Sequence, residues 1–158
     1  MSTTTRVPPH NLEMEAAILG AILLDNGALP RVIETLDSGA DFYKPANRKI
    51  YEAMLSLFEN NQPIDLMTVA ENLKAKGWLD SSGGVDYLAE LIDAVPTSAN
   101  AGMHAKIVRD KAMLRALIQV TTEGTGLAYE PTDDASSVVD SVESLIMRVS
   151  MKRVKNGA

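Results

Sequence analysis

The distribution of proline restricts the fold of this chain more than any other feature. There is no proline between Pro96 and Pro131, and none after Pro131. Proline removes a backbone donor and clashes with the preceding helical turn, so long helices need proline-free stretches. We therefore predict a long helix that is capped by Thr97 or Ser98 and runs to about Ala128.

A second long helix is predicted after a turn at Pro131, with its cap at Asp133-Asp134. Its apolar residues repeat in sevens, in the series Ala135, Val142, Val149 and the series Val138, Leu145. Helices that pair with other helices use this spacing. Two long helices joined by a short turn form an antiparallel hairpin, which we place at residues 97–150.

The charges of the two predicted arms differ in sign. Residues 101–129 hold four Lys/Arg and two Asp/Glu, whereas residues 130–150 hold one Arg and five acids. Opposite charges favour arms that lie together, although the effect is weak and depends on salt.

Residues 11–96 are predicted to form a compact helical head, because their apolar residues recur at steps of three and four. Residues 1–10 are expected to be a flexible lead, and residues 151–158 the start of a linker or a disordered tail. The predicted fold class is all-α, with a compact helical head followed by a long antiparallel helical hairpin.

Several helix ends within the head can be read from single residues. Asn11 and Asp65 are expected N-caps, and Pro45 suits the first turn of a helix. Gly77 is expected to end a helix in a Schellman motif, with Trp78 packed back against that helix. Glu13 and Glu15 both fall in the first turn after Asn11, where the helix dipole favours acids.

The stretch DFYKPANRKIYEAM, residues 41–54, allows two interpretations. Aromatic residues interleaved with Lys and Arg can stack bases and follow phosphates of a single strand. The same residues also make an amphipathic helix with an apolar stripe of period 3.6, preceded by Phe42 and Tyr43. We favour the second interpretation, in which this stretch belongs to the core.

The composition argues against a nucleic-acid-binding domain. The net charge is −6 and the predicted pI is near 4.9, whereas such domains are usually basic. The chain has no cysteine and no apolar run of membrane-spanning length. We expect a cytoplasmic protein with no membrane association and little direct DNA binding.

No constellation of catalytic or ligand-binding residues can be found. The sequence has no G-x-x-x-x-G-K-[ST] loop, and its two histidines, His10 and His104, are far apart. The paired carboxylates at residues 133 and 134 fall at a predicted helix start, where capping explains them. We expect no catalytic, cofactor or metal site on this chain.

The predicted hairpin carries more apolar surface than one partner arm can cover, and exposed apolar patches usually mark interfaces. We expect the dimer contact there, with Leu117 facing outward. The candidate interface residues are Ile107, Met113, Leu114, Leu117, Ile118, Val120, Val142, Leu145, Ile146 and Val149.

Five phrases in sequence resemble the N-terminal domain of the bacterial replicative DNA helicase, the DnaB family. They are PPHNLEMEAAILGAILLD, DFYKPANRKIYEAM, PIDLMTVAENLKAKGWL, GGVDYLAEL and VPTSANAGMHAKIVRDKAMLRALI. Two positions depart from the family pattern, since Asn47 and His104 stand where His and Tyr are expected.

This resemblance implies a non-catalytic domain that pairs through its hairpin and forms the collar of a hexameric ring as a trimer of dimers. It implies docking of the primase C-terminal domain on the collar, and handling of the collar by helicase loaders. ATP, Mg²⁺ and DNA translocation are implied only for a following motor domain, joined by a linker that would begin near the end of this sequence. A small helical nucleic-acid-binding protein is the alternative, supported by the basic C-terminus and the cations of residues 106–115.

Overall fold

The computed structural model describes the backbone of residues 6–157 and the side chains of residues 6–152. Every regular element in this described part is helical, which confirms the predicted all-α class. The chain divides into two compact units, residues 10–109 and residues 110–157 with 6–9. The predicted boundaries at residues 96 and 150 stay a prediction.

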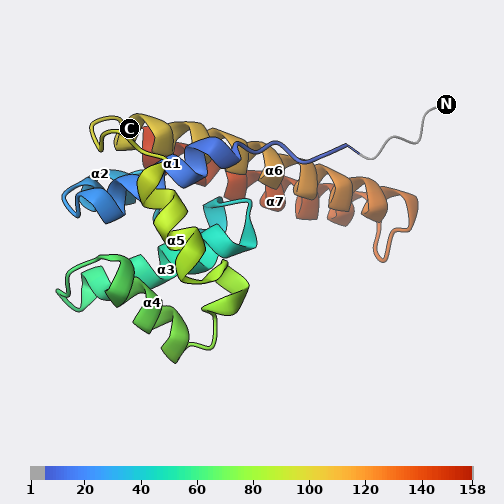
Figure 1. Cartoon of the computed structure of the whole chain (residues 1–158). Helices are drawn as coiled ribbons and strands as arrows, with labels where there is room; N and C mark the ends of the chain where they lie inside the picture. The colour runs from blue at the N-terminus through green and yellow to red at the C-terminus, as the bar shows by residue number, and fades with distance from the viewer. Residues whose placement is uncertain (1–5, 158) are drawn as a thin grey trace. The chain divides into compact units, whose positions relative to one another are not determined.

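The first unit contains short helices joined by tight turns (Figure 1). In chain order its elements are α1 (Leu12–Leu24), α2 (Ala28–Ile33), η1 (Gly39–Asp41), α3 (Pro45–Glu59), α4 (Leu66–Ala75), η2 (Asp80–Ser82) and α5 (Gly84–Asp93). The first nine residues of α6 (Ala101–Tyr129) also belong to it.

The helix ends predicted within this unit are confirmed. The Asn11 side chain accepts from the Met14 N–H at 3.0 Å. In a capping box, the Asp65 carboxylate accepts from the Thr68 N–H, and the Thr68 hydroxyl oxygen accepts from the Asp65 N–H. Gly77 has a φ of 73°, and the Trp78 N–H donates to the Leu73 carbonyl at 2.8 Å, as a Schellman motif requires.

The core of the first unit is built mainly from aliphatic side chains of α1 and α3, and α2, α4, α5 and the start of α6 add smaller shares. Ile18, Leu19 and Ile22 on α1 are fully buried, as are Phe42 and Tyr51. At Gly20 the backbones of α1 and α5 approach so closely that a Cβ would lie 2.1 Å from the Leu91 carbonyl oxygen. Burial raises the pKa of the Tyr51 hydroxyl above its ordinary range.

The start of α6 was predicted wrongly. The helix begins at Ala101, so neither Thr97 nor Ser98 is its cap. Tertiary contacts engage Ser98 instead, because its hydroxyl bonds the Asp25 carboxylate at 3.2 Å and its carbonyl accepts from Arg31. The first helical bond runs from the His104 N–H to the Asn100 carbonyl.

The second unit is a pair of long helices, the greater part of α6 and α7 (Ala135–Gly157), which run side by side in opposite directions (Figure 1). This confirms the predicted hairpin. Asp134 caps α7 by accepting from the Ser137 N–H at 2.9 Å, and hydrogen bonds from Ser137 lower the pKa of its carboxyl. Residues 151–157 continue α7, and the linker or tail predicted there stays a prediction. Ala158 and residues 1–5 of the predicted lead lie outside the described residues.

Candidate protein–protein interface

The stretch at residues 41–54 belongs to the head's core, as we favoured from its sequence. Phe42 and Tyr51 have no exposed surface, and their ring centroids lie 5.0 Å apart. Tyr43 is half-buried and stacks on the ring of His10 at 4.3 Å. Arg48 donates from Nε to the Phe42 carbonyl at 2.6 Å, so one of the cations is bonded back to the protein. A single strand would find few of these groups available for stacking.

Glu15 has a role that the sequence analysis missed. Its carboxylate is buried, and it accepts from the Tyr43 N–H at 2.7 Å and from the Lys44 N–H at 3.3 Å. Lys44 is the N-cap of α3 and provides no side-chain cap, so Glu15 of α1 caps that helix from a distance. Glu13, which we had grouped with Glu15, remains exposed.

Asn47 extends this buried network. Its Nδ2 donates to Glu15 Oε1 at 2.9 Å, and its Oδ1 accepts from the Tyr87 hydroxyl at 2.6 Å. Both side-chain polar atoms of the residue that departs from the family pattern are therefore hydrogen-bonded within the head. Buried polar groups that are satisfied in this way rigidify a core rather than destabilise it.

The side chains packed between the two arms of the hairpin are buried only in part. Side chains along both arms are only half-buried there, and Gly124 is the single buried position among the described residues of this unit. A Cβ at Gly124 would lie 3.2 Å from the methyl carbons of Val142, so the arms approach closely at this point. Met113, Val120, Val142, Leu145 and Val149, five of the ten candidate interface residues, are among these half-buried side chains.

Four other candidates lie on an exposed face. Leu114 and Ile118 of α6 are 46% and 50% exposed, and Leu117 and Ile146 are 41% and 39% exposed. Leu114, Leu117 and Ile146 line one shallow hollow between the two arms. Leu117 lies in this hollow beside Leu114, and Ile118 is the most exposed of the three, so the choice of Leu117 as the outward residue stays a prediction. Ile107 belongs to the first unit and is half-buried.

The exposed face continues toward the hairpin turn. Thr121 and Thr125 follow Leu114 and Ile118 on the same stripe of α6, and their hydroxyls donate to the carbonyls of Leu117 and Thr121. Because these hydroxyls are satisfied within the helix, the threonines add methyl groups to the surface. On α7, Val139 stands one heptad from Ile146 and is also exposed. We call these residues the hairpin face: Leu114, Leu117, Ile118, Thr121, Thr125, Val139 and Ile146.

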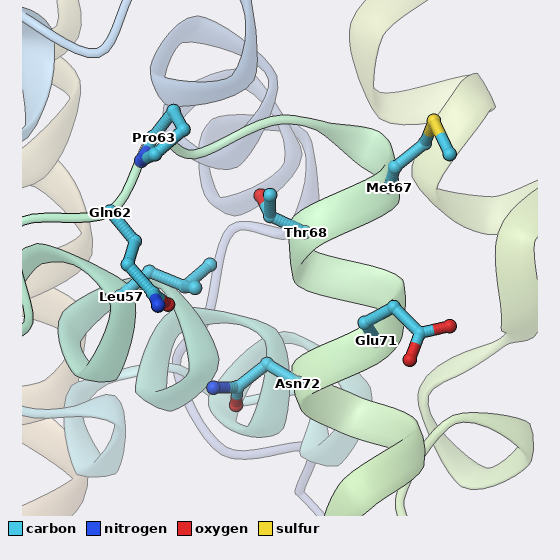
Figure 2. Close-up of a pocket in the computed structure, with 7 residues that line it drawn as sticks. All are labelled: Leu57, Gln62, Pro63, Met67, Thr68, Glu71 and Asn72. Atoms are coloured by element: carbon cyan, nitrogen blue, oxygen red, sulfur yellow. The ribbon is translucent and has the colours of Figure 1, made fainter.

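The head has a shallow hollow between α3 and α4, shown in Figure 2. Leu57 of α3 faces Thr68 and Asn72 of α4 across it, whereas Met67 and Glu71 point away. The lining contains no histidine and no pair of acids positioned for proton transfer. Among the described residues no group of three or more His, Asp or Glu is placed to hold a metal ion, and no helix is long and apolar enough to cross a membrane.

Comparison with known proteins agrees with this architecture. The family model described as DnaB-like helicase N terminal domain matches residues 7–110. The chain belongs to this family. It is 42% identical over 148 residues to the replicative DNA helicase DnaB of Geobacillus stearothermophilus, and 41% identical over 151 residues to that of Mycobacterium leprae. Each alignment covers 94% of this chain, but only 32% and 25% of those relatives, so the chain spans about a third or less of their length.

Solved structures show the same fold. The N-terminal domain of the DnaB helicase of Mycobacterium tuberculosis matches with a TM-score of 0.86 and 40% identity, over 90% of this chain and 99% of that one. A DnaB-like replicative helicase matches with a TM-score of 0.68 and 23% identity, over 88% of this chain and 31% of that one. The part of the family represented here is the N-terminal domain and not the motor.

Proposed function

We propose that this chain is the N-terminal domain of a replicative hexameric DNA helicase, where it joins subunits into the collar of the ring. It works by binding other proteins in the cytoplasm and not by catalysis. ATP and Mg²⁺ act in a motor domain elsewhere in the full-length protein. Family membership and the coverage of the curated relatives support this assignment.

The hairpin face is the single observation that carries the assembly role. Among the described residues of this helix pair only one position is buried, and a stripe of apolar side chains is exposed. This apolar surface is available for contact with another chain. A second hairpin offers the same chemistry, and pairing of two hairpins would produce the dimers from which a trimer of dimers is built. Symmetric dimers reuse one patch on both copies in this way.

Primase is the second partner in this proposal. The structure of the DnaB-like replicative helicase that shares this fold concerns its interactions with primase. By that likeness, we assign the docking of the primase C-terminal domain to this domain, and contact with a helicase loader is a further expectation.

Sedimentation of the chain alone, and then with the primase C-terminal domain from the same source, tests both parts. We expect concentration-dependent dimers of the chain, and a heavier complex when primase is added. A chain that stays monomeric at high micromolar concentration would count against the assembly role. Sedimentation unchanged by primase would count against docking.

Direct binding of single-stranded DNA is the competing function, and the structure disfavours it because residues 41–54 are committed to the core. Fluorescence anisotropy at physiological salt should show weak binding that salt abolishes. Tight, salt-resistant binding would favour the nucleic-acid alternative.

A further inference from the structure

The side chain of Asn26 links two segments of the head that are far apart in sequence. Its Nδ2 donates to the Ile64 carbonyl at 2.6 Å, and its Oδ1 accepts from the Ile64 N–H at 2.8 Å. The same Nδ2 also donates to the Ile22 carbonyl at 3.1 Å. Ile64 is buried and directly precedes Asp65, the N-cap of α4. One carboxamide therefore holds the start of α4 against the turn between α1 and α2.

Asn26 is followed by Gly27, and this pair of residues is chemically reactive. In an Asn-Gly pair the glycine nitrogen can attack the side-chain carbonyl carbon of Asn, because no Cβ on the next residue obstructs it. A five-membered succinimide forms and ammonia leaves, and water then opens the ring to give aspartate or isoaspartate. No enzyme, metal or oxidant is needed. The sequence holds two such pairs, Asn26-Gly27 and Asn156-Gly157.

In the folded head both reacting groups are engaged in hydrogen bonds. The Gly27 N–H donates to the Asp25 carboxylate at 3.0 Å. Attack requires this nitrogen to lose its proton, and a neighbouring negative charge opposes that loss. The nitrogen that leaves as ammonia is the one that donates to Ile64 and Ile22, so both bonds must break. The reaction therefore depends on local opening of the turn, although Asn26 and Gly27 are exposed.

The products of this reaction cannot rebuild the link. Aspartate has no N–H donor, so a carboxylate oxygen would face the Ile64 and Ile22 carbonyls in place of Nδ2. Acceptors that face each other without a donor cost free energy. Isoaspartate also lengthens the main chain by one carbon, which displaces the turn. Gln62 and Pro63, which line the hollow of Figure 2, directly precede Ile64, so its release also loosens this wall of the hollow.

We infer that Asn26 is a site of spontaneous deamidation that the fold protects, and that its conversion to aspartate or isoaspartate irreversibly releases the start of α4 from the α1–α2 turn. The inference is independent of the proposed assembly role. As a consequence, a chain that stays unfolded long enough to react does not regain the native head.

Peptide mass spectrometry of the parent chain, incubated in mildly alkaline buffer with and without urea, measures the reaction. Asn26 should react at least about tenfold more slowly in the folded chain than in urea, because the reaction follows opening of the turn. In urea, Asn156 should react as fast as Asn26, since both are followed by glycine. Equal rates at Asn26 in the folded and unfolded chain, or no reaction in urea, would overturn the inference.

Two variants separate the chemistry from its protection. Gly27→Ala should slow the reaction at residue 26 in urea, because the added methyl group obstructs attack. The φ of −62° at this position suits alanine, and the methyl group would meet only the flexible Asp25 side chain, 3.1 Å away. Asp25→Ala should speed the reaction in the folded chain severalfold, since the Gly27 N–H loses its carboxylate partner. Asp93→Ala, at an exposed acid of α5, is the control and should leave the rate unchanged. Equal rates in Asp25→Ala and the control would contradict the protection.

Asn26→Asp copies one product without the reaction. It should lower the melting temperature by several degrees, because the Ile64 and Ile22 carbonyls lose their donor. Asn61→Asp adds the same charge at an exposed position whose φ of 54° Asp also tolerates, and it should melt like the parent chain. If Asn26→Asp also melts like the parent, the link is not lost in the product and this part of the inference is overturned.

Discussion

The two units of this chain use apolar residues in opposite ways. In the head, residues 10–109, large side chains such as Ile18, Phe42 and Tyr51 are fully buried. In the hairpin, Gly124 is the only buried position among the residues described, and several large apolar side chains are exposed. The head has a core of its own, whereas the hairpin leaves apolar surface exposed, which we propose a second molecule covers. Substitutions should therefore alter folding in one unit and association in the other.

The largest effect should come from Phe42→Ala. Removal of this buried ring leaves a cavity in the head and should lower the free energy of unfolding by about 4 kcal/mol in urea titrations. Phe58, the other phenylalanine, is 43% exposed, so Phe58→Ala is the matched control and should cost about 1 kcal/mol or less. Similar losses for both would mean that the head is less tightly packed than described.

Glu15→Gln should have the next largest effect on the head. The neutral amide cannot accept the Tyr43, Lys44 and Asn47 donors as the carboxylate does, so the free energy of unfolding should fall by about 2 kcal/mol. Glu13→Gln, in the same helical turn but exposed, should leave the free energy of unfolding nearly unchanged. Equal effects would indicate that Glu15 acts only through the helix dipole.

Leu114→Asp should affect association and leave the head intact. A charge on the hairpin face should weaken dimerisation at least about tenfold in sedimentation, with the urea transition of the head unchanged. Leu12→Asp, at similar exposure on α1, is the matched control and should dimerise normally. Dissociation by the control but not by Leu114→Asp would move the interface from the hairpin to the head.

The smallest effect concerns the cap at Asp134. Hydrogen bonds from Ser137 lower the pKa of this exposed carboxyl, so its contribution is present above the ordinary pKa of Asp and is lost as pH falls through the lowered value. In NMR titrations, the Ser137 amide signal should shift with a midpoint below the ordinary Asp value. The change should stay local to the start of α7. A midpoint at or above that value would contradict the cap.

Much of this architecture could be predicted from sequence because it depends on local chemistry. Asn11, Asp65 and Gly77 mark helix ends through contacts within a few residues, and the proline-free stretches predicted the hairpin. The misplaced start of α6 and the buried role of Glu15 depend instead on residues far apart in the chain. The exposed side of α6 could not be chosen from sequence, because two sets of apolar residues satisfy helical periodicity equally well. These sets are Ile107, Leu114, Ile118 and Met113, Leu117, Val120.

The capping of α3 by Glu15 also constrains the order in which the head can fold. The two amides that lead into α3 are bonded by a carboxylate of α1, so the start of this helix lacks these hydrogen bonds until α1 is in place. The ordering of α3 is thereby coupled to the docking of another segment, which makes the folding transition more cooperative. Hydrogen exchange at the Tyr43 and Lys44 amides should report this docking step, and a peptide of residues 41–59 alone should leave both unprotected.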